Sequence, residues 1–207
     1  MSNLKLDSMV LTLEVIFESV DRDYWNAIPI RQIQLNMLNS GMLETVRDGG
    51  YELIGSYEGL DIRVKADISW NQTVKIRVKG FNTLSKLESI VAKITENVQE
   101  LREKDRSLLI KTILKPKDKG AIMVNKEKLV ETIRKLVNVT DYIIAELTPV
   151  KIGLTNIDSE IEVEVKKEQV KILRLITNME KAVETISLTD KIIDQILEAI
   201  EVVSLAE

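Results

Sequence analysis

The stretch of residues 82–161 constrains the fold most, because its apolar residues recur at alternating steps of three and four. This spacing keeps one side of a helix facing a partner helix. A polar turn at residues 115–120 divides the stretch into two arms. The first arm carries Leu84, Leu87, Val91, Ile94, Val98, Leu101, Asp105, Leu108 and Thr112. The second carries Leu129, Ile133, Leu136, Thr140, Ile143, Leu147, Val150, Leu154, Ile157 and Ile161. The pattern predicts a long antiparallel helical hairpin.

Two asparagines stand where the predicted arms begin. Asn82 and Asn125 each precede a helical pattern, and an asparagine side chain in that position can accept a hydrogen bond from a backbone N–H of the first turn. At about 1.5 Å per residue, each arm would span roughly 50 Å. A hairpin of that length favours assembly or an extended partner.

The first 81 residues have a different pattern. Residues 10–20 fit either a buried strand or a helix, and Pro29 can open a short helix that ends at Gly41. Four strands then follow at residues 42–47, 51–57, 60–69 and 73–79. In the last two, apolar and charged residues alternate, which predicts one buried and one solvated face.

This β-rich module allows two functional readings by topology. Its order of elements is that of helix-grip ligand-binding domains. A winged helix is the alternative, with residues 30–40 as recognition helix and residues 47–57 as wing, although Arg31 is the one charge in that helix and phosphate binding needs more. We favour a structural module that positions the hairpin.

Beyond the hairpin, two shorter helices are expected, at residues 172–186 and 187–203. Pro149, with Gly153 nearby, marks either a hinge in the second arm or the end of a helix at Thr148. Residues 160–168 also fit a strand. The expected fold class is therefore α+β, with a β-rich α+β module at residues 1–81 and a helical hairpin or bundle at residues 82–207.

Composition argues against most enzymes. The 207 residues include no cysteine and no histidine, which removes thiolate chemistry, the usual proton shuttle and the commonest metal ligand. The glycines form no nucleotide-binding fingerprint. The acidic pair Asp21 and Asp23 is more typical of a turn than of a cation site. We expect no enzyme activity, no cofactor and no metal.

Charge is unevenly distributed. Residues 102–135 contain eleven basic and five acidic residues, whereas residues 136–207 contain seven basic and fourteen acidic ones. Such runs are often solvated surface. They also suit a cationic hairpin tip that binds an anionic surface, with an acidic tail that competes for it. The candidate anion-binding residues are Arg102, Lys104, Arg106, Lys111, Lys115, Lys117 and Lys119.

Residues 101–111 (LREKDRSLLIK) and 120–135 (GAIMVNKEKLVETIRK) resemble the hairpin of the ESCRT-III proteins, in particular the archaeal CdvB-type cell-division subunits. The resemblance extends over residues 82–203. It implies a helical core that polymerises and remodels membranes. The family's tail motif for its AAA-type ATPase does not follow Val203, so the resemblance does not supply this partner.

The leading hypothesis from the sequence is thus a self-assembling membrane-remodelling or cell-division protein that binds an anionic membrane. One alternative is a nucleic-acid-binding protein that uses the basic tip. Another is a non-enzymatic ligand-binding or adaptor protein centred on the N-terminal module. No run of about eighteen apolar residues and no signal peptide is apparent, so we expect a cytoplasmic protein, peripheral at a membrane if it binds one.

Overall fold

The computed structural model describes residues 3–19, 39, 45–48, 52–57, 59–67, 73–81, 83–96 and 101–204. The chain forms two compact units. Unit 1 comprises Met1–Met9 and Leu109–Glu207, and unit 2 comprises Val10–Leu108. Both unit boundaries fall inside long strands, and neither coincides with the division expected at residues 81/82.

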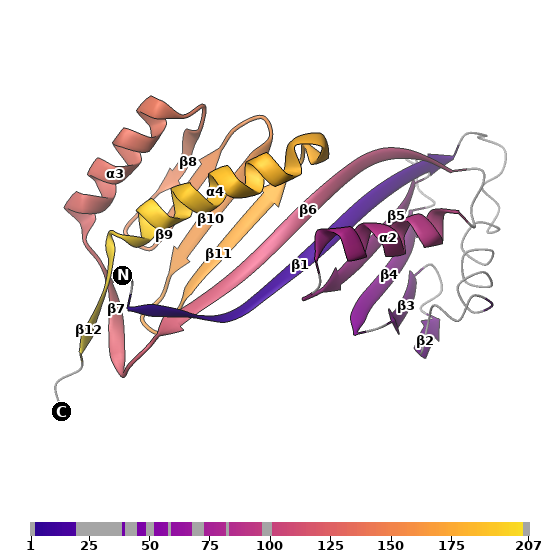
Figure 1. Cartoon of the computed structure of the whole chain (residues 1–207), viewed down its shortest axis with the longest axis horizontal. Helices are drawn as coiled ribbons and strands as arrows, with labels where there is room; N and C mark the ends of the chain where they lie inside the picture. Colours follow the sequence, from indigo (N-terminus) through magenta and orange to yellow (C-terminus); the bar gives the residue numbers. More distant parts are fainter. Residues whose placement is uncertain are drawn as a thin grey trace. The chain divides into compact units, whose positions relative to one another are not determined.

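Unit 2 is built around an antiparallel sheet with the strand order β2-β3-β4-β5-β1 (Figure 1). Its elements are β1 (Leu4–Ser19), β2 (Thr45–Asp48), β3 (Glu52–Tyr57), β4 (Leu60–Asp67), β5 (Thr73–Gly80) and α2 (Leu84–Thr95). The four strands predicted at residues 42–79 agree with β2 to β5. Gly59 has a φ of 77° in the tight β3–β4 turn, a conformation that glycine adopts without strain.

One face of the unit 2 sheet is apolar. Every second residue is buried from Leu11 to Phe17 in β1, from Leu60 to Val64 in β4 and from Val74 to Gly80 in β5. Helix α2 packs on β5 through an apolar stripe of the usual helical spacing. The buried residues of this core are Leu11, Leu13, Val15, Phe17, Leu60, Ile62, Val64, Val74, Ile76, Val78, Leu87, Ile90 and Val91. No described helix covers the opposite face.

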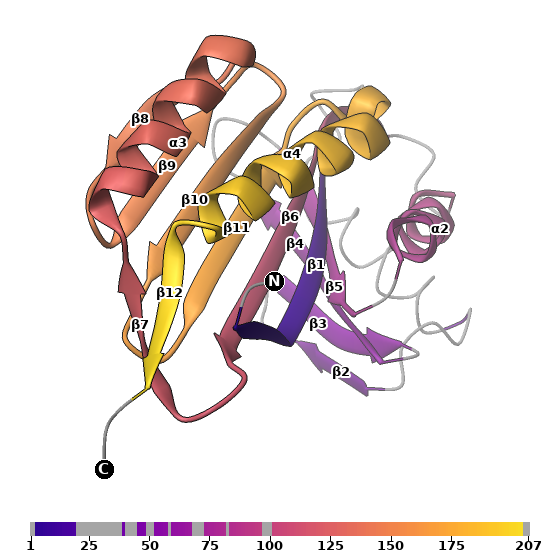
Figure 2. The same ribbon diagram turned by 60° about the vertical axis from the view of Figure 1, so that its left-hand side comes forward.

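Unit 1 has a sheet in the order β6-β11-β10-β9-β8 and a two-stranded ribbon of β7 and β12. Its elements are β6 (Leu101–Pro116), β7 (Gly120–Val124), α3 (Lys126–Val139), β8 (Ile143–Leu147), β9 (Lys151–Thr155), β10 (Ser159–Val165), β11 (Val170–Ile176), a 3-10 turn (Met179–Lys181), α4 (Ala182–Leu197) and β12 (Ile200–Ser204). Figures 1 and 2 show α3 and α4 on the same face of β8 to β11.

The core of unit 1 lies between these two helices and the sheet. Leu129, Ile133 and Leu136 of α3 are buried there, as are Ile192 and Ile196 of α4. Asn125 caps α3, because its Oδ1 accepts a hydrogen bond from the backbone N of Lys128 at 3.1 Å. This cap was predicted from the sequence. The other predicted cap, Asn82, lies outside the described residues.

The predicted first arm of the helical hairpin is wrong. Helix α2 ends at Thr95, and residues 101–116 form strand β6. In β6 the buried residues are Leu108 and Ile110, two positions apart, as in a strand with one covered face. The spacing of three and four in this stretch was therefore a coincidence of composition.

The predicted second arm is also wrong after its first half. Helix α3 ends at Val139, and β8, β9 and β10 follow. Three residues assigned to the helical seam are exposed: Ile143 at 62%, Val150 at 59% and Ile157 at 89%. The fold is mainly antiparallel sheet, so the expected class, with a long helical hairpin or bundle at residues 82–207, is corrected. The resemblance to the ESCRT-III proteins is therefore wrong, and so is the membrane-remodelling or cell-division function predicted from it, because both depended on that hairpin.

The C-terminal helices were predicted only in part. Residues 170–176 form strand β11, where the sequence pattern had indicated a helix. Helix α4 occupies residues 182–197, and residues 200–204, expected in the final helix, pair as β12 with β7. Most of the short helix predicted to begin at Pro29 lies outside the described residues. Its one described residue, Asn39, is helical.

The two units repeat one plan. In each, a long strand precedes a four-stranded meander whose last strand lies beside it, and a helix then packs on that last strand. Residues 61–66 and 160–165 are 99 positions apart and share the pattern acidic-Ile-x-Val-x-apolar. The motif Val-Lys-Ile begins both at Val74 and at Val170. Such self-similarity indicates an internal duplication.

Strand registers support the duplication. Ile62 pairs with Val78 and Val64 with Ile76 in unit 2. At the equivalent positions of unit 1, Ile161 pairs with Arg174 and Val163 with Ile172. Because the register is the same, residues 61–66 of β4 and 74–79 of β5 have counterparts in β10 and β11 on the same face of the sheet.

Candidate functional site

The face of the unit 2 sheet opposite α2 carries a set of cations. Alternation places the residues between the buried ones on this face. They include Arg63 and Lys65 on β4 and Lys75, Arg77 and Lys79 on β5, here called the basic row. Asp61 lies on the same face, directly opposite Lys79. Four of them are exposed and Lys75 is half-buried.

Like charges face each other across the strands. In the β4–β5 register, Arg63 lies opposite Arg77 and Lys65 lies opposite Lys75. Side chains directly opposite one another in an antiparallel pair have Cβ atoms about 5 Å apart, and like charges at that spacing are destabilising. Packing of the unit 2 core does not require this arrangement, because these side chains point away from it.

Acidic residues on this face partly neutralise the basic row: Asp61 lies opposite Lys79, and Glu14 lies on the adjacent strand β1. Glu14 of β1 accepts hydrogen bonds from Arg77 Nε at 3.0 Å and Nη2 at 2.6 Å, and pairs with Lys75 Nζ at 3.0 Å. Partial burial raises the pKa of the Glu14 carboxyl, but the bonds from Arg77 and Lys75 together outweigh it, so the net shift of this pKa is downward. Among the residues whose side chains the structure describes, Lys65 and Lys79 form no ion pair.

On the equivalent face of unit 1, two positions of the row have the opposite charge, whereas Lys171 keeps the cation of Lys75. Glu162 and Glu164 of β10 occupy the positions of Arg63 and Lys65. With Glu160 they are here called the acidic row. Lys151 pairs with Glu162 at 3.2 Å. Hydrogen bonding by Lys166 is the main cause that lowers the pKa of Glu164, with Lys171 contributing.

Two leucines lie beside the acidic row. Leu173 is directly opposite Glu162, and Leu175 is directly opposite Glu160. By register they replace Arg77 and Lys79 of unit 2, and both are half-buried. The two units thus share most of the apolar side of the sheet, whereas the cations of unit 2 on the other side are replaced in unit 1 by Glu162, Glu164, Leu173 and Leu175.

The seven cations singled out in the sequence do not form a helical tip. All lie on strand β6 or in the β6–β7 turn, and residues 102–106 belong to unit 2 whereas residues 111–119 belong to unit 1. Arg102 and Lys104 pair with Glu18, and Lys115 pairs with Asp7 at 3.1 Å. Arg106 pairs with Glu103 at 2.7 Å and Glu88 at 3.7 Å. Lys111, Lys117 and Lys119 are exposed.

The two residues predicted to form a hinge lie in a β-hairpin. Pro149 is in the β8–β9 turn, which Thr148 closes by a backbone hydrogen bond from its N to Lys151 O at 2.8 Å. Gly153 is in β9 opposite Glu146, beside a register shift in β8. A Cβ atom at Gly153 would approach Glu146 Cβ at 3.3 Å. The helix that Pro149 was expected to kink is absent.

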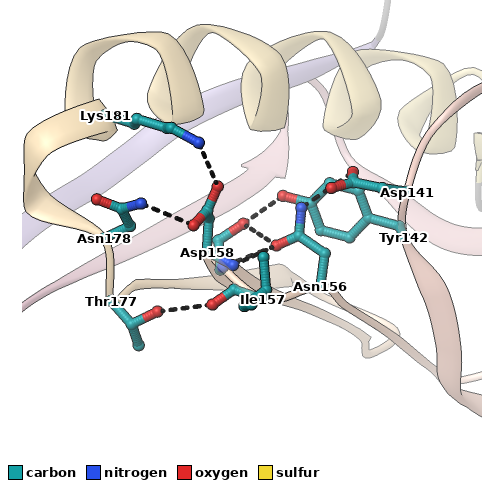
Figure 3. A network of polar contacts seen from close by, with 9 residues as sticks. Asp141, Tyr142, Asn156, Ile157, Asp158, Thr177, Asn178 and Lys181 are labelled. Carbon is teal, nitrogen blue, oxygen red and sulfur yellow. Dashed lines mark hydrogen bonds and ion pairs between the residues drawn. The ribbon is translucent and has the colours of Figure 1, made fainter.

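A network of polar side chains closes one end of the unit 1 sheet (Figure 3). Asn156 Oδ1 accepts hydrogen bonds from the backbone N of Asp158 at 3.0 Å and of Ser159 at 2.8 Å. Asp158 in turn binds Asn178 Nδ2 at 2.8 Å and Lys181 Nζ at 3.6 Å. These bonds fasten the β9–β10 turn to the segment before α4, so their evident role is structural.

Unit 1 also has an open groove of about 640 Å³. Its lining includes Asn3, Lys128, Asp194, Leu197, Glu198 and Glu201. Lys128 Nζ donates to the backbone oxygen of Glu198 at 2.7 Å, so the lysine is already engaged. The volume suits a small ligand, but the groove pairs no nucleophile with a base.

The described residues offer neither a metal site nor a membrane-spanning helix. Among them, no cluster of three or more Asp, Glu, His or Cys side chains is arranged to hold a metal ion. Asp21 and Asp23 lie outside the described residues, as do residues 30–38 of the proposed recognition helix. No helix in the described part of the chain has the length and apolar character to cross a bilayer.

Comparison with known proteins adds little. No protein-family model matches the chain, and no curated protein matches it. Among solved structures, the chain is similar to the aspartate kinase of Clostridium acetobutylicum, described as an allosteric enzyme, with 9% identity and a TM-score of 0.28. The match covers 94% of this chain and 34% of the kinase chain. At that TM-score the likeness supports no conclusion about function.

Sequence reasoning identified the strands that bear the basic row but not the row itself. The alternation in residues 60–68 and 73–79 placed their charged residues on a solvated face, without the register that sets arginine against arginine. Two signals were available: the repeated Val-Lys-Ile motif and the spacing of 99 residues between Ile62 and Ile161.

Proposed function

We propose that this chain is a non-enzymatic binding or adaptor protein that holds an acidic partner on the basic row of unit 2. The observation that carries the proposal is the pairing of Arg63 with Arg77 and of Lys65 with Lys75 across exposed strands. Glu14 already pairs with Lys75 and Arg77, and an anionic partner would neutralise further positive charge on this face. The arrangement therefore favours the bound state over the unbound one.

The geometry of the row favours an extended partner. Alternate residues of a strand point to the same side and are about 6.6 Å apart, so the row presents cations at regular steps along two neighbouring strands. A partner segment with a carboxylate at every second residue has the same spacing. Each carboxylate of the partner can form an ion pair with a lysine or arginine of the row, and each such pair at a surface contributes modestly to the binding free energy.

A carboxylate partner suits this face better than a nucleic acid. Single-stranded nucleic acids bind basic grooves that also offer aromatic side chains for base stacking. On the exposed face of β4 and β5, the described side chains of residues 61–65 and 73–79 include no aromatic residue.

Binding to poly-L-glutamate tests the proposal. We expect the wild-type chain to bind it at low salt and to lose most of that binding in the double variant Arg63→Glu, Arg77→Glu. The matched control, Lys117→Glu with Lys119→Glu, makes the same charge change in the β6–β7 turn of unit 1 and should bind as wild type does. Equal loss in both variants, or tighter binding of a single-stranded oligonucleotide than of polyglutamate, would overturn it.

A further inference from the structure

We infer that the acidic partner is a second copy of this chain, whose acidic row on unit 1 docks on the basic row of unit 2. This inference rests on the proposed function, since it names the partner for the same face. The chain itself carries a row of matching spacing in which glutamates replace cations, Glu162 for Arg63 and Glu164 for Lys65.

The match in spacing follows from the duplication. Glu162 and Glu164 stand in unit 1 where Arg63 and Lys65 stand in unit 2, in the same strand of the meander and the same register. Each row therefore repeats at the two-residue step of a strand. Two such rows can oppose one another so that several carboxylates meet several cations at once.

Both faces are accessible to another sheet. Figure 2 shows α3 and α4 on one face of β8 to β11. The buried residues of β10 and β11 belong to the core beneath these helices, so alternation along the strands places the acidic row on the other face. In unit 2 the basic row lies opposite the core that α2 covers. Sheets packed face to face are about 10 Å apart, a distance that glutamate and lysine or arginine side chains can bridge together.

Leu173 and Leu175 give the acidic face an apolar component. They adjoin Glu162 and Glu160, and neither is fully buried in the single chain. Covering them with the aliphatic parts of lysine and arginine side chains would remove apolar surface from water. Charge then sets the orientation of the two copies, and this contact adds to the binding.

Existing ion pairs moderate the contact. Lys151 pairs with Glu146 and Glu162, and Lys171 and Lys166 pair with Glu164, so the acidic row is partly neutralised before docking. Glu160 forms no ion pair among the described residues. The association should therefore be weak and sensitive to salt, because exposed charges are screened over about 8 Å at physiological ionic strength.

Sedimentation velocity of the full chain, with a complementary pair of variants, tests the inference. One variant carries Arg63→Glu and Arg77→Glu, and the other carries Glu160→Lys and Glu162→Lys. We expect wild type to self-associate at low salt, and each variant alone to associate about tenfold more weakly. An equimolar mixture of the two should associate at least as well as wild type, since each supplies the face that the other lacks.

The outcomes separate this inference from the proposed function. A mixture that associates no better than the separate variants, while each variant keeps its circular dichroism spectrum, overturns docking between copies. If wild type then still binds polyglutamate through the basic row, the proposed function stands and the partner is another acidic protein. The Lys117→Glu, Lys119→Glu control should self-associate like wild type, and a loss there equal to that of the row variants would contradict the inference as well.

Discussion

Arg174, buried on the helix-covered face of β11, forms an ion pair with Asp190 of α4. Its Nε has no hydrogen-bond partner. In unit 2 the equivalent position is Val78, which is fully buried. The same framework therefore accommodates an apolar residue in one copy of the plan and a charged one in the other.

Removing the partner of this arginine should destabilise unit 1. We expect Asp190→Ala to lower the free energy of unfolding by about 1–2 kcal/mol, because it leaves a buried guanidinium without its carboxylate, although Asp190 is half exposed and water can reach the pair. Urea unfolding followed by circular dichroism measures it. A change below the error of the fit would show that the pair contributes nothing.

Replacing the arginine itself should be tolerated. We expect Arg174→Val, which copies unit 2, to leave stability unchanged or to raise it, since well-packed apolar residues often replace buried ion pairs without loss. In the Arg174→Val background, Asp190→Ala should cost almost nothing, and this double-mutant cycle isolates the pair. A loss of several kcal/mol in Arg174→Val alone would contradict the equivalence of the two positions.

The buried hydroxyl pair of Tyr142 and Ser159 should make unit 1 sensitive to alkali. Burial raises the pKa of the Tyr142 phenol from its ordinary value of 10.0, the contact with Ser159 opposes this, and the charges of Asp141 and Asp158 raise it further. The pKa of Tyr142 is higher in the folded state than in the unfolded state. The stabilisation that comes from its neutral phenol is therefore fully present below pH 10 and is lost as the pH rises from 10 through the folded pKa. Tyr142→Phe should cost about 1 kcal/mol at pH 7 and should remove part of the alkaline loss in urea unfolding. An unchanged alkaline profile would contradict this assignment.

Glu14 should stabilise unit 2 at neutral pH and lose that role in acid. The pKa of its carboxyl is lowered, so its stabilising effect is present above the ordinary value of 4.5 and is lost as the pH falls through the folded pKa. We expect Glu14→Gln to cost about 0.5–1 kcal/mol at pH 7. The difference between variant and wild type should shrink toward zero in more acidic solution, as thermal unfolding across pH would show. A difference that stays constant would rule out ionisation as its source.

The sequence predicted secondary structure correctly where its apolar residues followed either the helical or the strand spacing but not both. The alternation in residues 60–68 and 73–79 identified β4 and β5, and Asn125 identified the start of α3. The prediction was wrong where the apolar residues fitted both spacings. Around Leu108 the run of apolar residues fits a helical seam at Leu101 and Leu108 and also a strand at Leu108 and Ile110, and short apolar runs do not decide between them.

Strands β10 and β11 show why the secondary structure of this region could not be assigned without tertiary context. Ile161, Val163 and Val165 are β-branched and alternate with acidic residues, a pattern typical of strands. The sequence prediction nevertheless ended the second helical arm at Ile161 and placed a further helix over the residues of β11. Comparison of residues 61–76 with residues 160–172 would have assigned these strands by internal repetition. The opposite charges of the two rows depend on register, which the sequence does not specify without the turn lengths.

The central claim is that the exposed face of β4 and β5 binds acidic partners, and an NMR titration of the full chain with poly-L-glutamate tests it most directly. We predict that amide signals of Arg63, Lys65, Lys75, Arg77 and Lys79 shift together and saturate with one affinity. Shifts confined to the groove around Lys128 and Asp194, or no shift at low salt, would contradict the account.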